Sequence, residues 1–219
     1  MKITTYLTIS LLTIAGSASA ATTIAYEFNG ATTEGWTGSG QISGLSTTGA
    51  VSGSENVLTS SDITGIDPML NNAAGATLTP GETWSTFTAR FRLLDANAGS
   101  PLAFVNSGTI LIFNGNAGTN NSTAFATKSY NGNNALAGDV FNMTLTPEGS
   151  GEWQVVTVDF SNAPAFNSAN ISAIRFDPVG NDQVKNFEID YIRLESVPEP
   201  SSTALLGLGL GGFLLRRRR

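Results

Sequence analysis

The stretch Ser85–Leu94, which reads STFTARFRLL, alternates between two kinds of side chain. Phe87, Ala89, Phe91 and Leu93 are apolar, and the residues between them are threonine or arginine. Successive side chains of a β-strand point to opposite faces, so this order gives one apolar face and one polar face. The stretch therefore predicts a strand with one side on a hydrophobic core.

Six further segments have a similar character and are separated by turn-forming clusters. They are residues 23–28 (TIAYEF), 108–113 (GTILIF), 140–145 (VFNMTL), 153–160 (WQVVTVDF), 171–178 (ISAIRFDP) and 186–195 (NFEIDYIRLE). The segment 108–113 is apolar on both faces, which predicts a central strand. The clusters 114–122 (NGNAGTNNS), 131–134 (NGNN) and 147–151 (PEGSG) have the composition of hairpin turns and loops. Strands at this spacing predict an all-β fold, an antiparallel β-sandwich or jelly roll, in one domain over residues 21–196.

The N-terminal segment, residues 1–20, has the layout of a secretory signal peptide. Lys2 is followed by an apolar run from Leu7 to Ile14, and small residues at Ala18 and Ala20 form a cleavage site. We expect this segment to be a helix that signal peptidase removes after Ala20. The alternative is an N-terminal helix that stays buried in the fold.

The C-terminal segment, residues 197–219, combines a proline-containing triplet, an apolar run and a basic end. These parts are Pro198, Glu199 and Pro200; residues 204–215; and Arg216, Arg217, Arg218 and Arg219. The apolar run is twelve residues long, whereas a membrane-spanning helix needs about 20. The arginines would stay on the cytoplasmic side of a membrane. We therefore expect a short hydrophobic helix that associates only transiently with the inner membrane; the alternative is a permanent C-terminal anchor.

Composition excludes several kinds of chemistry. The chain has no cysteine and no histidine. It therefore lacks disulfides, zinc–thiolate sites, and the most frequent general base and transition-metal ligand. Between the terminal segments, six basic residues stand against sixteen acidic ones, which gives a net charge of −10. Such a body repels nucleic acid and anionic lipid and suits neutral or cationic ligands.

The triplet, the short apolar run and the arginine cluster together resemble the PEP-CTERM sorting signal of Gram-negative bacteria. The resemblance covers the last 23 residues, and the N-terminal segment agrees with it. It implies that exosortase, a transpeptidase-like membrane enzyme, cuts near the triplet. The body would then reach the cell surface or the extracellular matrix.

The body itself resembles secreted carbohydrate-binding modules with a galactose-binding-like jelly-roll fold. The motifs that carry this resemblance are YEFNGATTEGW (26–36), TGIDPML (64–70), FTARFRL (87–93), WQVVTVDFSNAP (153–164), ISAIRFDPVG (171–180) and FEIDYIRL (187–194). The resemblance implies a non-enzymatic module that binds or organises polysaccharide. In such modules an early-strand carboxylate and a last-strand aspartate often share a structural calcium ion, and the matching positions are Glu27 and Asp190. The alternative is that both are solvated acids at strand edges.

A ligand-binding face is predicted from parity along two strands. Counted in steps of two, Trp84, Arg90 and Arg92 fall on the polar face of the strand predicted at 85–94, and Arg175 is polar between two apolar neighbours. Aromatic rings stack on sugar rings, and arginines hydrogen-bond to hydroxyls, so we expect these four residues to bind sugar. The alternative is that the arginines pair with strand acids and that Trp84 covers the core.

The last predicted strand matches part of the Glu-x-Asp-x-x-Glu strand of laminarinase-type glycosidases. Glu188 and Asp190 fit its first two carboxylates, but the third position falls at Arg193, or at Leu194 in the bulged version. Glycoside hydrolysis by two carboxylates then lacks its second member. We therefore expect an exported β-sandwich that is not an enzyme. The alternatives are a purely structural matrix protein without a ligand, and an enzyme that acts on glycans with carboxylates alone.

Overall fold

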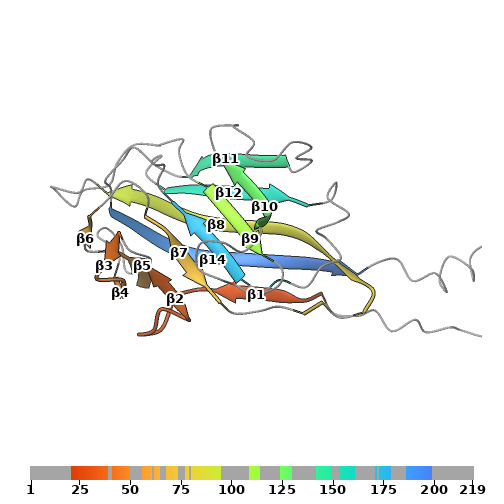
Figure 1. Ribbon diagram of the computed structural model, residues 1–219, viewed down its shortest axis with the longest axis horizontal. Coiled ribbons are helices and arrows are strands. Elements are labelled where there is room, and N and C mark those ends of the chain that lie inside the picture. Colours follow the sequence, from red (N-terminus) through yellow and green to blue (C-terminus); the bar gives the residue numbers. More distant parts are fainter. Residues whose placement is uncertain are drawn as a thin grey trace, which may run out of the picture.

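The computed structural model describes residues 21–38, 41–49, 56–60, 62–64, 68–73, 77–78, 80–94, 109–113, 124–129, 142–148, 153–160, 171, 173–178 and 186–198. These residues form fourteen β-strands (Figure 1). Every strand pair is antiparallel. The expected helices at 1–20 and 204–215 lie outside the described residues, and none of the described ranges contains a helix that could cross a membrane.

One sheet has seven strands and is built around two long strands, β8 and β14. Its order is β11 (Asn142–Glu148), β12 (Trp153–Asp159), β8 (Glu82–Leu94), β14 (Asn186–Pro198), β5 (Asn56–Thr59) and β4 (Ser46–Gly49), with β1 (Thr23–Tyr26) also paired to β14. Because β8 occupies one edge of β14 along its whole length, β1 and β5 share the other edge. The chain thus pairs its first described strand with its last.

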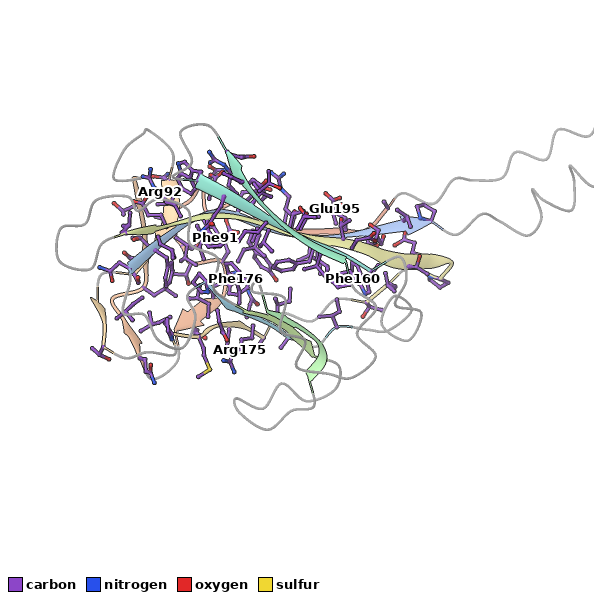
Figure 2. The ribbon with its side chains drawn as sticks, turned by 90° about the horizontal axis from the view of Figure 1, so that it is seen from above. Phe91, Arg92, Phe160, Arg175, Phe176 and Glu195 are labelled. Carbon is purple, nitrogen blue, oxygen red and sulfur yellow. The ribbon has the colours of Figure 1, made fainter. Side chains whose placement is uncertain are left out.

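The second sheet has five strands. Its order is β10 (Ala124–Ser129), β9 (Thr109–Phe113), β13 (Ala173–Asp177), β7 (Leu70–Asn72) and β2 (Trp36–Gly38). A separate pair, β3 (Ile42–Ser43) and β6 (Asp62–Ile63), completes the described strands. The internal place of β9 confirms the central strand predicted at 108–113. The two sheets stack face to face, which confirms the predicted antiparallel sandwich (Figure 2).

Two β-bulges change the direction of side chains along the central pair. Tyr191 pairs with Arg90 and Ile189 with Phe91, which leaves Asp190 as an extra residue on β14. On β8 the extra residue is Ser85, since the partners of Ser196 and Glu195 are Trp84 and Thr86. A single extra residue moves every following side chain to the opposite face. These bulges therefore decide which residues reach the core.

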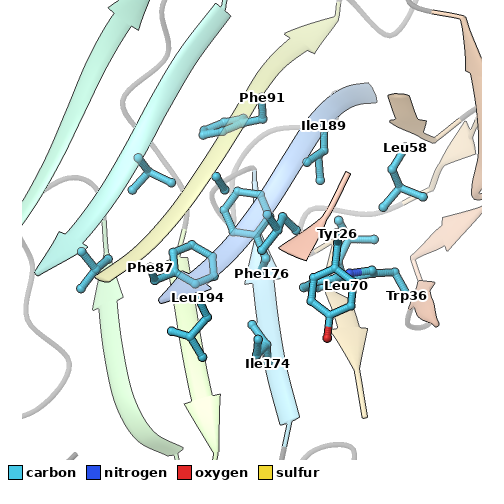
Figure 3. Close-up of a cluster of buried hydrophobic side chains, with 14 of the residues drawn as sticks. Tyr26, Trp36, Leu58, Leu70, Phe87, Phe91, Ile174, Phe176, Ile189 and Leu194 are labelled. Atoms are coloured by element: carbon cyan, nitrogen blue, oxygen red, sulfur yellow. The ribbon is translucent and has the colours of Figure 1, made fainter. Parts of the chain in front are cut away.

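The core lies between the sheets and is rich in aromatic residues (Figure 3). Phe176 of β13 packs against Phe91 and Phe87 of β8, with ring centroids 5.4 and 6.2 Å apart. Tyr26 of β1 meets Trp36 of β2 edge to face at 5.4 Å. Each contact joins one sheet to the other. Aromatic pairs of this geometry contribute about 0.5–1.5 kcal/mol beyond the area they bury.

Candidate ligand-binding face

The outer face of the seven-stranded sheet carries a charged network centred on Arg90. Arg90 Nε donates a hydrogen bond to Oε2 of Glu148 at 2.7 Å, and Nη1 donates to Oδ2 of Asp190 at 2.8 Å. The three residues come from β8, β11 and β14. Burial opposes the charge on Arg90, but its bonds to Glu148 and Asp190 outweigh that effect, so the pKa of Arg90 is raised. The network fixes a cation between two acids across the sheet.

An aromatic ring lies directly beside this network. The guanidinium carbons of Arg90 and Arg92 lie 4.3 and 4.5 Å from the ring centroid of Trp153, the first residue of β12. Cations attract the face of an indole ring at such distances. Trp153 is half-buried, so part of it is accessible to a ligand. The β11–β12 register places it opposite Glu148.

A buried ion pair adjoins the same ring. Arg92 Nε donates to Oε2 of Glu188 at 2.6 Å, and both side chains are 1% exposed. The pair joins β8 to β14 where Glu188 lies opposite Arg92. Because neither group reaches solvent, this pair supports the face from below and does not offer a contact to a ligand.

A second arginine cluster lies further along β14. Arg193 Nε and Nη2 donate to the two oxygens of Glu27 at 2.6 and 2.9 Å, and the guanidinium carbon lies 4.1 Å from the ring centroid of Tyr191. The hydrogen bond from Arg193 lowers the pKa of Glu27, despite burial, and raises that of Arg193. Burial, with help from Glu148, raises the pKa of Tyr191. At neutral pH the cluster is a bidentate ion pair beside a neutral phenol.

Trp84 does not lie on this face, and its predicted orientation is wrong. The side chain is 1% exposed and belongs to the core. The extra residue at Ser85 is the reason, because it turns Trp84 to the same side as Phe87. Core packing was the alternative that the sequence left open for this tryptophan.

Arg175 lies on the other side of the molecule. It belongs to β13, and Figure 2 shows Arg92 and Arg175 on opposite outer sides with Phe91 and Phe176 between them. Arg175 Nε donates to Oδ1 of Asp177 at 2.8 Å. The four residues predicted to bind sugar therefore do not form one surface. Only Arg90, and Arg92 beneath the surface, adjoin Trp153, whose place beside them follows from strand pairing and has no signal in the sequence.

Both carboxylates of the predicted calcium site, Glu27 and Asp190, bind arginine side chains. Glu27 accepts both of its short hydrogen bonds from Arg193, and Asp190 accepts one from Arg90. Calcium needs six to eight oxygen ligands. In the part of the chain that the structure describes, no three acidic residues gather as a metal site would require. These residues therefore do not fit the ion as they stand, because each carboxylate is bound by a guanidinium.

The glycosidase-like strand shows the same kind of pairing. Glu188 binds Arg92, Asp190 binds Arg90, and Arg193 occupies the third motif position while binding Glu27. Each acidic member is thus held by a guanidinium. The sequence has no carboxylate at the third position of the motif, which is Arg193, or Leu194 in the bulged version.

Comparison with known proteins identifies the C-terminal segment. A family model of the PEP-CTERM protein-sorting motif matches residues 196–219, which confirms the sorting signal expected at 197–219. The protein is therefore exported and sorted, through exosortase, to the surface or extracellular space of a Gram-negative bacterium. The signal peptide at 1–20 stays a prediction.

The body has structural likenesses of low sequence identity. A cyclase from Fischerella sp. TAU is similar at a TM-score of 0.50 and 17% identity, covering 83% of this chain and all of that one. A Stig cyclase of the same organism, in complex with an indole compound, gives 0.43 and 18%, covering 81% and 86%. An apo-form cyclase from Fischerella sp. gives 0.41 and 16%, covering 87% and 93%. At 17% identity the first likeness shows the β-rich fold alone, and the galactose-binding-like fold stays a prediction. No curated protein matches the chain.

Proposed function

We propose that the exported body binds polysaccharide through the outer face of the seven-stranded sheet, around Trp153 and Arg90. The observation that supports this function is a row of fixed donors and acceptors beside aromatic rings. Arg90 lies between Glu148 and Asp190, and its guanidinium lies against Trp153. Sugar hydroxyls both donate and accept hydrogen bonds, and sugar rings stack on aromatic faces, so such a row suits a glycan chain.

The charge of this face indicates which class of polysaccharide it would bind. Apart from the buried pair of Arg92 and Glu188, the acids Glu27, Glu148, Asp190 and Glu195 accompany the arginines Arg90 and Arg193 on this face. Among the members of the Arg90 network, Glu148 has the most exposed side chain, at 45%. An approaching ligand therefore meets acidic oxygens first. Neutral or cationic polysaccharides fit this surface better than anionic ones do.

A glycan array tests the proposal. The body is produced as residues 21–198, because β14 continues to Pro198, and is compared with Trp153→Ala and Arg90→Gln. We expect a neutral or amino-sugar polymer to bind the wild type and to lose at least about tenfold in affinity in both variants, as ~1.4 kcal/mol of lost contacts would give. Arg175→Ala, on the opposite sheet, is the control and keeps full affinity.

Three other results decide between the rivals. Loss of binding in Arg175→Ala alone would move the ligand face to the five-stranded sheet. A repeat with a calcium chelator tests whether Glu27 and Asp190 need an ion for binding. No glycan bound under any condition would remove the proposal.

A purely structural role is the second candidate, and one observation favours it. Two N–H donors of Arg90, Nε and Nη1, already bind acids of β11 and β14, which stiffens the sheet and leaves fewer groups for a ligand. A structural protein would bind no glycan, yet its loss would weaken the matrix or surface layer. Release of reducing ends from the arrayed glycans would instead support the enzyme alternative.

A further inference from the structure

A small polar cluster closes one end of the hydrophobic core. Oε2 of Glu82 accepts hydrogen bonds from Thr22 Oγ1 at 2.6 Å, from Ser196 Oγ at 2.9 Å and from the Thr22 amide at 3.3 Å. The Thr22 amide also donates a hydrogen bond to Ser196 Oγ at 2.8 Å. Glu82 and Ser196 are 5% and 3% exposed. We call these three residues the terminal clamp.

The clamp joins the two ends of the body. Thr22 is the second residue after the predicted signal peptidase site, and Ser196 is the first residue of the matched sorting motif. Besides the side-chain contacts, the Ser196 amide donates to the Thr22 carbonyl at 2.9 Å. The start of β1 and the end of β14 lie together at one end of the sandwich (Figure 1). The predicted signal peptidase site and the start of the sorting motif therefore lie close in sequence to residues that bind the same buried carboxylate.

The last strand continues past the clamp into the sorting motif. Val197 pairs with Thr83, and Pro198 pairs with Glu82, in the same ladder that joins β14 to β8. No linker separates the body from the proline-containing triplet, because Pro198 is both the last residue of β14 and the first residue of the triplet. The sheet thus holds the backbone of the motif as far as Pro198.

An enzyme that cuts a peptide chain must have access to that backbone. Extended substrates commonly bind by adding a strand to an edge of the receiving protein, which requires free backbone groups. Ser196 has β8 on one side and Thr22 on the other. Exposing it would break the hydrogen bonds of the clamp and leave the Glu82 carboxylate buried without them, which is costly.

We infer that the sorting signal is cut C-terminal to Pro198, so that Pro198–Glu199 is the first bond after the end of β14, and that the mature body keeps its clamp. The cut breaks one peptide bond. The carbonyl carbon passes to water or to an acceptor amine, and the released tail keeps the nitrogen as a new amino group. This inference rests on the sorting motif and the strand pairing, and it is independent of glycan binding.

The first test locates the cut in the natural process. The full chain is expressed in a Gram-negative host that has exosortase, and the mature protein is recovered from the surface or medium. Intact mass and C-terminal peptide sequencing are expected to give Pro198 or a later residue as the C-terminus. A body that ends at Val197 or earlier would contradict the inference, as would a protein that keeps its terminal arginines.

The second test asks whether the clamp protects the strand. The purified full chain in detergent is treated with a low concentration of proteinase K, and the C-terminus is followed by mass spectrometry. Wild type is expected to stop at Pro198 or later while tryptophan fluorescence shows an intact core. In Glu82→Gln, trimming past Ser196 is expected to be about tenfold faster, which corresponds to ~1.4 kcal/mol.

A matched control separates the clamp from a general loss of charge. Glu195→Gln makes the same chemical change next to Ser196, at an exposed residue outside the clamp. It should be trimmed at the wild-type rate. Equal rates in wild type, Glu82→Gln and Glu195→Gln, or trimming of the folded wild type to before Ser196, would overturn the protective role.

Discussion

Arg92 of β8 and Glu188 of β14 form an ion pair at 2.6 Å in which each side chain is only 1% exposed. Taking two such charges out of water costs several kcal/mol for each ion, and their attraction repays that cost only when the geometry is good. The ring of Trp153, 4.5 Å from the guanidinium, adds a further favourable contact. The pair therefore adds little net stability, yet removing one member alone leaves a buried charge without its partner and destabilises the fold.

Single and double variants of this pair are expected to differ sharply. Arg92→Met and Glu188→Leu should each lower the free energy of unfolding by about 3–5 kcal/mol, because each leaves the other member of the pair as an uncompensated buried charge. The double variant Arg92→Met/Glu188→Leu should return to within about 1 kcal/mol of wild type, since no charge remains to be desolvated. Urea unfolding of residues 21–198 measures all three. Additive losses in the double variant would show that the pair is not coupled.

The two tryptophans near β8 should respond differently to truncation. Trp84 is fully buried in the core, whereas Trp153 is half-buried on the outer face. We expect Trp84→Ala to cost about 3–5 kcal/mol of unfolding free energy, as other large-to-small core changes do, and Trp153→Ala to cost clearly less. The same urea titration compares them. A greater loss in Trp153→Ala would place the core on the wrong side of β8.

The sequence predicts the sandwich well and the face poorly, and the central strands show why. The alternation at 87–93 identifies a core-facing strand because period two is a local property. The bulge at Ser85 has no comparable signal, since Ser85 and its neighbour Thr86 are both polar and either could be the extra residue. Without the bulge, parity assigns Trp84 to the outer face.

The residues of the face depend on pairings that are distant in sequence. Arg90 meets Glu148 and Asp190 across separations of 58 and 100 residues. Composition cannot predict such a register. Pairing of the strand arginines with acids was the alternative that the sequence left open, and Arg90, Arg92 and Arg175 each have such a partner.

Removal of one buried hydroxyl should stabilise the fold. Tyr26 Oη is buried and has no hydrogen-bond partner among the described residues, and burial, with Glu34, raises the pKa of Tyr26. An unsatisfied buried polar group costs about 1–3 kcal/mol. We therefore expect Tyr26→Phe to raise the free energy of unfolding by about 1 kcal/mol, while its edge-to-face contact with Trp36 persists. Tyr191→Phe, at a half-buried ring, is the control and should change little; a loss of stability in Tyr26→Phe would reveal a partner for the hydroxyl.

Lowering the pH should remove the contribution of the Glu27–Arg193 ion pair to the free energy of unfolding. The hydrogen bond from Arg193 holds the pKa of Glu27 below its ordinary value of 4.5 in the folded protein. A group whose pKa is lowered by folding stabilises the fold above its unfolded pKa, and this contribution is lost as the pH falls through the folded pKa. Both side chains are more than a third exposed, so solvent screening limits the contribution to less than about 1 kcal/mol at pH 7.

The variant Glu27→Gln should therefore be slightly less stable than wild type at pH 7, and the difference should shrink below pH 4.5 as Glu27 of the wild type takes up its proton. Urea unfolding at a series of pH values between neutral and acidic measures this difference. Salt should reduce it at pH 7, because exposed pairs are screened. A difference that stays constant from neutral to acidic pH would mean that Glu27 acts through packing and not through its charge.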